Sequence, residues 1–234
     1  MANQKLQVIP TITEAIQLGI KNVASLIATI VLYVLTVWIP YLNVGTTIGL
    51  YRIIIDMTKG KIINPLSIFN KENFRNLGNF FLLLGLLSMG LSAAAIFMLI
   101  PAIVMGIAWG YAIYFLIEKK MTPVKAMALS DKVTDGEKWN IFFIQLVFGL
   151  CFSIVSGIFM LIPKVGVVLV ILLAIVFAAA AVALEAVMYR HFAEKAEALL
   201  AEAKPCCHKP EPEAPAEPEA PAPEAPAEPE APAE

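Results

Sequence analysis

An uncharged apolar run from Asn79 to Ile117 is the feature that most constrains the fold of this chain. Its 39 residues contain no Asp, Glu, Lys, Arg or His. As a single helix at 1.5 Å per residue it would be about 58 Å long, nearly twice the ~30 Å hydrocarbon core of a bilayer. Pro101 lies near the middle of the run, and proline removes a backbone donor and disfavours helical geometry at the preceding residue. The run therefore predicts two membrane-spanning helices joined by a tight turn at Ile100–Pro101–Ala102.

The same Ile-Pro break recurs in two other apolar segments. Pro40 follows an apolar stretch that begins near Ala24, and Pro163 interrupts the long segment from Ile141 to Tyr189. Successive breaks are 61 and 62 residues apart, which suggests three hairpins of one design. We therefore predict an all-α polytopic membrane helix bundle with six transmembrane helices in three proline-broken hairpins. The second span, over residues 44–57, is the weakest of the six.

Short amphipathic helices at the membrane surface are predicted before each hairpin. Residues 14–26 place small and apolar residues along one helix side. Asn64–Pro65 and Thr122–Pro123 each predict a helix start, because Asn and Thr suit the N-cap and Pro suits the first helical position. The second of these helices is predicted to stop at Gly136.

The charges predict the orientation of the spans. Residues 210–234 contain eight Glu and no basic residue, so the rest of the chain carries 17 basic against 11 acidic residues. The basic residues concentrate in the loops 58–78 and 118–140, whereas the Ile-Pro turns contain only Lys164 between them. The positive-inside rule then predicts a multi-pass protein of the inner (cytoplasmic) membrane with both termini in the cytoplasm.

Residues 205–234 differ in composition from the predicted membrane domain, residues 1–204. They read PCCHKPEPEAPAEPEAPAPEAPAEPEAPAE, and the hexapeptide EPEAPA begins at Glu211, Glu217 and Glu228. A segment so rich in Pro and Glu cannot bury apolar surface, so we predict an extended, disordered tail. It is either an inert solvated tail or a docking segment for a cytoplasmic protein.

Few residues suit catalysis or metal binding. The two histidines, His191 and His208, both follow the last predicted span, and the chain contains no P-loop or nucleophile elbow. Cys206, Cys207 and His208 are metal-ligand types, but three consecutive residues cannot easily complete one tetrahedral site. We therefore predict no enzymatic activity, no cofactor and no metal.

Arg52 is the charged residue that most needs a partner, because a charge inside a span is costly unless it is paired. One interpretation pairs it with Asp56, four residues further along the same helix. The other pairs it with Glu185 of the last span to line a polar path. Gln145 adds a further polar residue inside the spans, so Arg52, Asp56, Glu185 and Gln145 form the candidate intramembrane polar site.

Small residues recur at four-residue spacing, which in lipid lets helix backbones approach closely. The sets are Gly45 and Gly49, Gly106 and Gly110, and Gly149, Ser153 and Gly157. Packing within the bundle is the simpler interpretation, and a contact between copies in a homo-oligomer is the alternative.

Residues 126–149, AMALSDKVTDGEKWNIFFIQLVFG, resemble the signature of a family of uncharacterised bacterial integral membrane proteins. Members carry Ala-x-x-x-Ser followed by Gly-x-x-Trp at the start of an apolar span, which Ala126, Ser130, Gly136 and Trp139 match. Residues 49–61, 99–101 and 189–190 are similar as well. A related fold occurs in the membrane domain of some glycerophosphodiester phosphodiesterases. The resemblance covers about residues 10–195 and implies a six-helix architecture without catalytic residues.

Two functions follow from these observations. The leading hypothesis is a non-enzymatic membrane protein of structural or accessory role, whose basic loops contact anionic lipid and whose tail recruits a partner. The alternative is a small transporter or channel with a polar path near Arg52. A water-filled cavity near Arg52 would favour the transporter, and a dry, glycine-packed bundle would favour the structural role. No nucleic-acid partner is expected.

Overall fold

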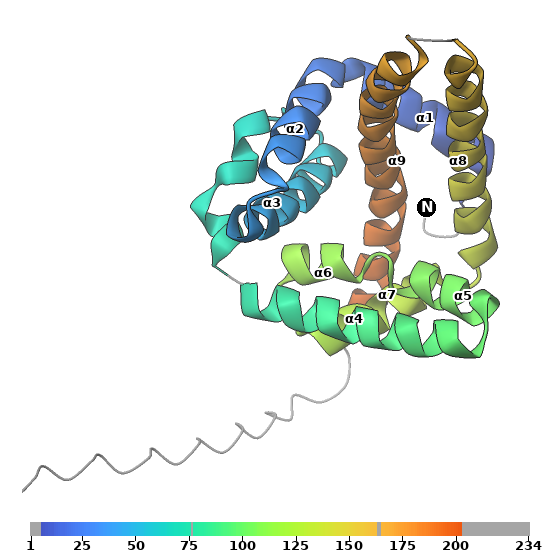
Figure 1. Cartoon of the computed structure of the whole chain (residues 1–234). Helices are drawn as coiled ribbons and strands as arrows, with labels where there is room; N and C mark the ends of the chain where they lie inside the picture. Colours follow the sequence, from blue (N-terminus) through green and yellow to red (C-terminus); the bar gives the residue numbers. More distant parts are fainter. Residues whose placement is uncertain (1–5, 76, 163–164, 203–234) are drawn as a thin grey trace, which may run out of the picture.

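The computed structural model describes residues 6–75, 77–162 and 165–202, and these residues form helices and no strand (Figure 1). In chain order the elements are α1 (Val8–Lys21), α2 (Val23–Thr36), α3 (Pro40–Thr58), η1 (Pro65–Phe69), η2 (Lys71–Phe74), α4 (Leu77–Phe97), α5 (Leu99–Trp109), α6 (Ala112–Lys119), α7 (Pro123–Thr134), α8 (Lys138–Met160) and α9 (Gly166–Glu202). The predicted turn at Pro163 and Lys164 lies outside the described residues. So do the tail and its Cys206, Cys207 and His208.

Helix α9 is the central element of the fold. Helices α1, α2, α3 and α8 all pack against it (Figure 1). Its buried hydrophobic residues fall between Ala179 and Ala196, whereas Val167, Ile171 and Val176 in its first half are more than half exposed. An apolar surface of this kind is stable in contact with lipid or with another protein. The first half of α9 is therefore suited to the membrane, and the second half carries the core.

Several helices have the length and composition of membrane spans. Within the described ranges α4, α8, α9 and the joined α5–α6 are long and apolar enough to cross a membrane, and α1 with α2 adds a fifth if that pair is one span bent by 83°. This arrangement is that of a polytopic helical membrane protein. The four or five candidate spans are fewer than the six predicted, and α3, the predicted weak span, is not among them.

Pro40 and Pro101 lie in the first turns of helices and do not form the turns between helices. The break between α4 and α5 lies at the extended residue Met98, three residues before Pro101. The turn predicted at Ile100–Pro101–Ala102 is thus displaced, and Pro101 occupies the first turn of α5. Proline is tolerated there because backbone N–H groups of the first turn have no acceptor within the helix. Pro40 likewise is the first residue of α3.

The hairpins do not repeat one orientation. In Figure 1 the α4–α5 hairpin runs crosswise to α8 and α9. Membrane helices tilt from the bilayer normal by about 20° on average. Both pairs could therefore cross the same bilayer only with strong tilt, and the regular spacing of the Ile-Pro breaks does not correspond to three equivalent hairpins.

The first long loop folds back onto α3. The predicted cap is confirmed at η1, where the Asn64 side chain accepts a hydrogen bond from the Leu66 N–H at 3.1 Å. Gly49 and Gly45 allow this close approach. A Cβ added at Gly49 would lie 2.6 Å from Ile68 Cα, and one at Gly45 would overlap the Phe74 ring. These two glycines therefore contact the loop and not a neighbouring spanning helix.

Candidate functional site

Arg52 has a partner that differs from both predicted ones. Its guanidinium lies 3.0 Å from Glu72 Oε2 in η2, and it also donates to the Glu72 carbonyl oxygen at 3.3 Å. Asp56 instead accepts from Lys61 Nζ at 2.8 Å. These contacts replace the predicted pairings of Arg52 with Asp56 or Glu185. The cavity beside Arg52 has a volume of only about 60 Å³.

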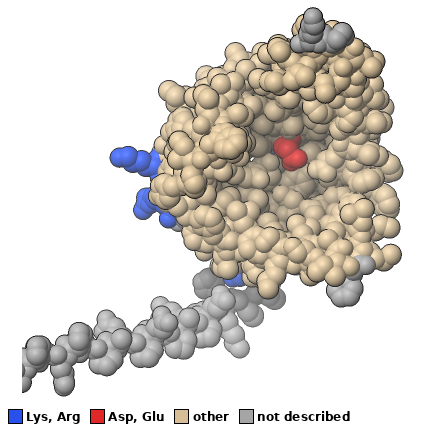
Figure 2. Space-filling view, viewed as in Figure 1, with Lys and Arg blue, Asp and Glu red and all other residues tan. Residues whose placement is uncertain are grey.

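The other two predicted residues, Glu185 and Gln145, line one larger cavity. It has a volume of about 340 Å³ and lies between α5, α8 and α9, with Gly110 and Tyr111, which connect α5 to α6, at one side. Its apolar walls include Ile103, Ile107 and Phe142. Figure 2 shows a hollow on one face of the molecule with an acidic side chain inside it. The structure therefore brings together half of the predicted polar site and separates it from Arg52.

Small residues leave room for this cavity. Gly106 and Gly110 both line it, and a Cβ at Gly106 would meet only Leu91, at an ordinary 3.6 Å. Gly149, Ser153 and Gly157 lie elsewhere, on the exposed face of α8, and a Cβ at either glycine would meet no atom within 4 Å. The set on α8 therefore does not serve close packing between α8 and the rest of the described chain.

The cavity lies at a break in a candidate spanning helix. The break between α5 and α6 falls at Gly110 and Tyr111, and both residues line the cavity. Ser130 of α7 satisfies the backbone groups at the break, because its Oγ accepts from the Tyr111 N–H at 3.2 Å and donates to the Ala108 carbonyl at 2.6 Å. Ser130 is fully buried. The Ser130 hydroxyl thus pairs the backbone N–H and C=O groups that the break leaves without partners in the helix, as a broken helix inside a membrane requires.

The Glu185 carboxylate has no counterion in the part of the chain that the structure describes. None of those residues donates a hydrogen bond to it or forms an ion pair with it. Its electrostatic neighbours are the hydroxyl groups of Tyr51, Tyr111 and Tyr114. Glu185 is half-buried, and a carboxylate without a positive partner is costly inside a membrane. A bound cation or a proton would remove that cost.

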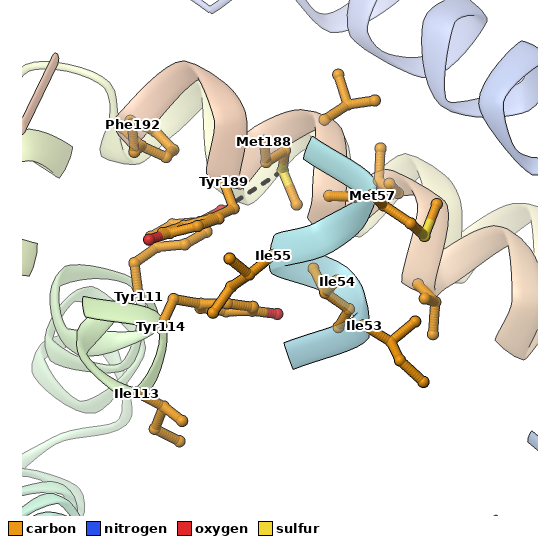
Figure 3. Packing of buried hydrophobic residues seen from close by; sticks show 14 of the residues in the cluster. Ile53, Ile54, Ile55, Met57, Tyr111, Ile113, Tyr114, Met188, Tyr189 and Phe192 are labelled. Carbon is orange, nitrogen blue, oxygen red and sulfur yellow. Dashed lines mark hydrogen bonds between the residues drawn. The ribbon is translucent and has the colours of Figure 1, made fainter. Parts of the chain in front are cut away.

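Aromatic residues connect the cavity to the core. Tyr114 stacks on Tyr189 with ring centroids 4.7 Å apart, and Tyr111 packs against Phe192 at the same distance (Figure 3). The Tyr111 hydroxyl donates to the Met188 sulfur at 3.6 Å. These contacts fix α6 against α9 and hold Tyr111 at the cavity wall.

An ion-paired layer lies beyond the aromatic residues. Glu118 at the end of α6 accepts from Lys59 Nζ at 2.6 Å and also from the Tyr189 hydroxyl. Lys119 pairs with Glu197 of α9 at 2.7 Å. Lys59 begins the first long loop and Lys119 the second, so these contacts join the starts of both lysine-rich loops at one end of the molecule.

Glu137, which the sequence analysis did not identify, is the centre of a second polar cluster. Its side chain is only 7% exposed and lies 2.9 Å from His191 Nε2 and 3.1 Å from Lys195 Nζ. It also accepts from the Leu6 N–H at 3.0 Å, and Asn140 donates to the Leu6 carbonyl at 2.9 Å. Burial opposes ionisation of Glu137, but the hydrogen bonds outweigh it and lower the pKa from 4.5 to about 2. The cluster ties the start of α1 to α8 and α9.

The described residues contain no group of three or more His, Cys, Asp or Glu side chains arranged to hold a metal ion. Comparisons of the chain with protein-family models, curated proteins and solved structures gave no match. The interpretation of the site therefore rests on its geometry.

Proposed function

We propose that this chain is a multi-pass membrane protein that binds a proton or a small monovalent cation at Glu185 and serves as a small transporter or channel for it. The observation that carries the proposal is the Glu185 carboxylate, which lines a cavity of about 340 Å³ together with Gln145 and has no counterion among the described residues. Carboxylate and amide oxygens are hard ligands suited to such cations. The ionisable residue and the cavity occur together, as is common along ion pathways in membranes.

The break between α5 and α6 supports the same proposal. Discontinuous membrane helices often form the binding sites of transporters. Here Gly110 and Tyr111 lie both at the break and at the cavity wall. The site that we propose thus consists of Glu185 and Gln145 and does not include Arg52.

The proposed orientation puts the ion-paired end of the molecule in the cytoplasm. The contact between Lys59 and Glu118 brings the beginnings of both lysine-rich loops together, which supports a single compartment for both. On the same argument we propose the inner membrane and cytoplasmic termini. We also propose that the chain is related to the bacterial family that residues 126–149 resemble and shares its six-helix architecture.

A structural or accessory role is the second candidate. Figure 2 shows Lys and Arg side chains at the edge of the molecule beside η1 and η2, where they suit contact with anionic headgroups at about 1 kcal/mol each. The exposed ladder of Gly149, Ser153 and Gly157 suits a contact between copies of the chain, and residues 205–234 suit recruitment of a cytoplasmic protein. Against this candidate, Lys59 and Lys61 already have acidic partners.

Cation flux through reconstituted protein tests the proposal. The full chain is placed in liposomes, a membrane potential is imposed, and flux of H⁺, Na⁺ and K⁺ is followed with ion-sensitive dyes inside the vesicles. We expect Glu185→Gln to lower flux of the accepted cation by about 10- to 100-fold, since a hydrogen bond to a charged group contributes about 1.5–3 kcal/mol. Glu194→Gln, which neutralises an exposed glutamate of the same helix, is the matched control and should leave flux unchanged.

Chemical labelling gives an independent readout. Dicyclohexylcarbodiimide is an apolar reagent that modifies protonated carboxyl groups, and mass spectrometry locates the modified residue. We expect Glu185 to be labelled and the accepted cation to protect it. If flux of all three cations is the same in wild type and Glu185→Gln, and no cation protects Glu185, the binding and transport proposal is wrong.

A further inference from the structure

A second, mostly apolar groove lies beside the Glu185 cavity. It has a volume of about 420 Å³, within the usual range of small-molecule sites. One wall is formed by α5, through Ile100, Ile103, Val104 and Ile107, and the other by Trp139 and Phe142 of α8. Ile103, Ile107 and Phe142 also line the Glu185 cavity, so the two spaces adjoin.

One end of this groove is polar and lies at the start of α8. Asp135, Gly136 and Lys138 line it there, and Trp139 is 71% exposed. Tryptophan at the end of an apolar helix is typical of the membrane–water interface. An apolar wall beside a headgroup-like end is the shape of a site for one lipid chain.

The charges at the polar end select among headgroups. Lys138 lies 2.9 Å from Asp131 and 4.0 Å from Asp135, whose side chain is 81% exposed. Nearby Lys195 is already paired with Glu137. One ammonium therefore faces two carboxylates. A uniformly anionic headgroup would meet net negative charge here, whereas a zwitterionic headgroup offers a phosphate for Lys138 and a cation for Asp135.

We propose that this groove binds a phospholipid whose zwitterionic headgroup carries a primary amine. One acyl chain lies between α5 and α8, the phosphate faces Lys138, and the ammonium donates hydrogen bonds to Asp135. A primary ammonium is favoured over a quaternary one because it retains three N–H donors for the carboxylate. The lipid would cover the side of the molecule where the Glu185 cavity adjoins the groove, but its binding does not depend on Glu185.

Quenching of Trp139 fluorescence by brominated lipids tests this assignment. The full chain carries Trp38→Phe and Trp109→Phe, which leaves Trp139, and is reconstituted in phosphatidylcholine vesicles with brominated phosphatidylethanolamine or brominated phosphatidylglycerol. We expect the ethanolamine lipid to bind about two- to fivefold more strongly at Trp139, the range of an exposed ion pair. Asp135→Asn should remove this preference, and Val104→Phe should reduce quenching by both lipids because it fills the groove.

Two controls define the outcome. A chain that keeps only Trp38, which is 86% exposed, reports contact with bulk lipid and should show equal quenching by both lipids. Glu185→Gln should leave the preference at Trp139 unchanged, so failure of the cation proposal and failure of this one are distinguishable. Equal quenching at Trp139, or stronger quenching by the glycerol lipid, would overturn the assignment.

Trp109 lies against Gly90, so its replacement can disturb folding. Native mass spectrometry of wild type and Asp135→Asn measures the same lipid preference without replacing Trp109.

Discussion

Replacing Glu137 by Gln is expected to loosen the first helix from α8 and α9. The pKa of Glu137 is about 2 in the folded chain, against 4.5 for an unperturbed glutamate. This difference corresponds to about 3 kcal/mol of stability, because each pKa unit is worth 1.36 kcal/mol. The side chain is only 7% exposed, so screening by solvent is small. Gln keeps an acceptor for the Leu6 N–H but removes the charge that faces His191 and Lys195.

The sign of the pH dependence follows from the depressed pKa. A carboxylate that is more acidic in the folded chain stabilises it fully above its unfolded pKa and loses that effect as pH falls through the folded pKa. The contribution of Glu137 should therefore decrease from about 3 kcal/mol at pH 7 to about 1.4 kcal/mol at pH 3. It should approach zero below pH 2.

Unfolding in mixed micelles measures this difference. Helix content is followed by circular dichroism for wild type, Glu137→Gln and Glu194→Gln, at pH 7 and at pH 3. Hydrogen exchange of the Leu6 amide, whose N–H bonds to Glu137, reports the local effect and should accelerate in Glu137→Gln alone. A Glu137→Gln penalty of equal size at both pH values, or a similar penalty for Glu194→Gln, would refute the assignment of this stability to the ionised carboxylate.

Two further substitutions test the packing of α3 and the reassignment of Arg52. Gly49→Ala should destabilise the fold by about 1–3 kcal/mol in the same unfolding assay, because the new Cβ would lie 2.6 Å from Ile68 Cα. The control is Gly85→Ala, whose new Cβ would meet no atom within 4 Å and should not destabilise the fold. Arg52→Gln should cost less than ~1 kcal/mol, since it removes only an exposed ion pair with Glu72, and should leave cation flux unchanged. A strong loss of cation flux in Arg52→Gln would show that the polar path includes Arg52.

The helices and several of their starts could be predicted from short stretches of sequence. Asn64 accepts the hydrogen bond expected of a cap, and Pro40, Pro65 and Pro123 are each the first residue of a helix. These features depend on a residue and its immediate neighbours, because capping and proline sterics act within one turn. The apolar composition that makes four or five helices suitable for a membrane is equally local.

The arrangement of those helices depended on contacts that no short stretch contains. Pro101 could be recognised as a break, but its place inside the first turn of α5 followed from where Met98 became extended. The regular spacing of the Ile-Pro breaks suggested equivalent hairpins, whereas the α4–α5 pair lies crosswise to α8 and α9 (Figure 1). Helix packing is decided by side chains from distant segments, so a local repeat does not determine it.

The candidate site divides in the same way. Polarity within apolar segments was sufficient to select Glu185 and Gln145, but only the packing of α5, α8 and α9 placed them on one cavity. The contact of the first long loop with α3 paired Arg52 with Glu72. Glu137 lacked any local signal, since its partners His191 and Lys195 lie 54 and 58 residues away in the chain. Composition and neighbouring residues thus determined which segments are helical and apolar. The tertiary structure decided which charges are paired and which carboxylate stays unpartnered, because electrostatic partners are chosen by distance in space.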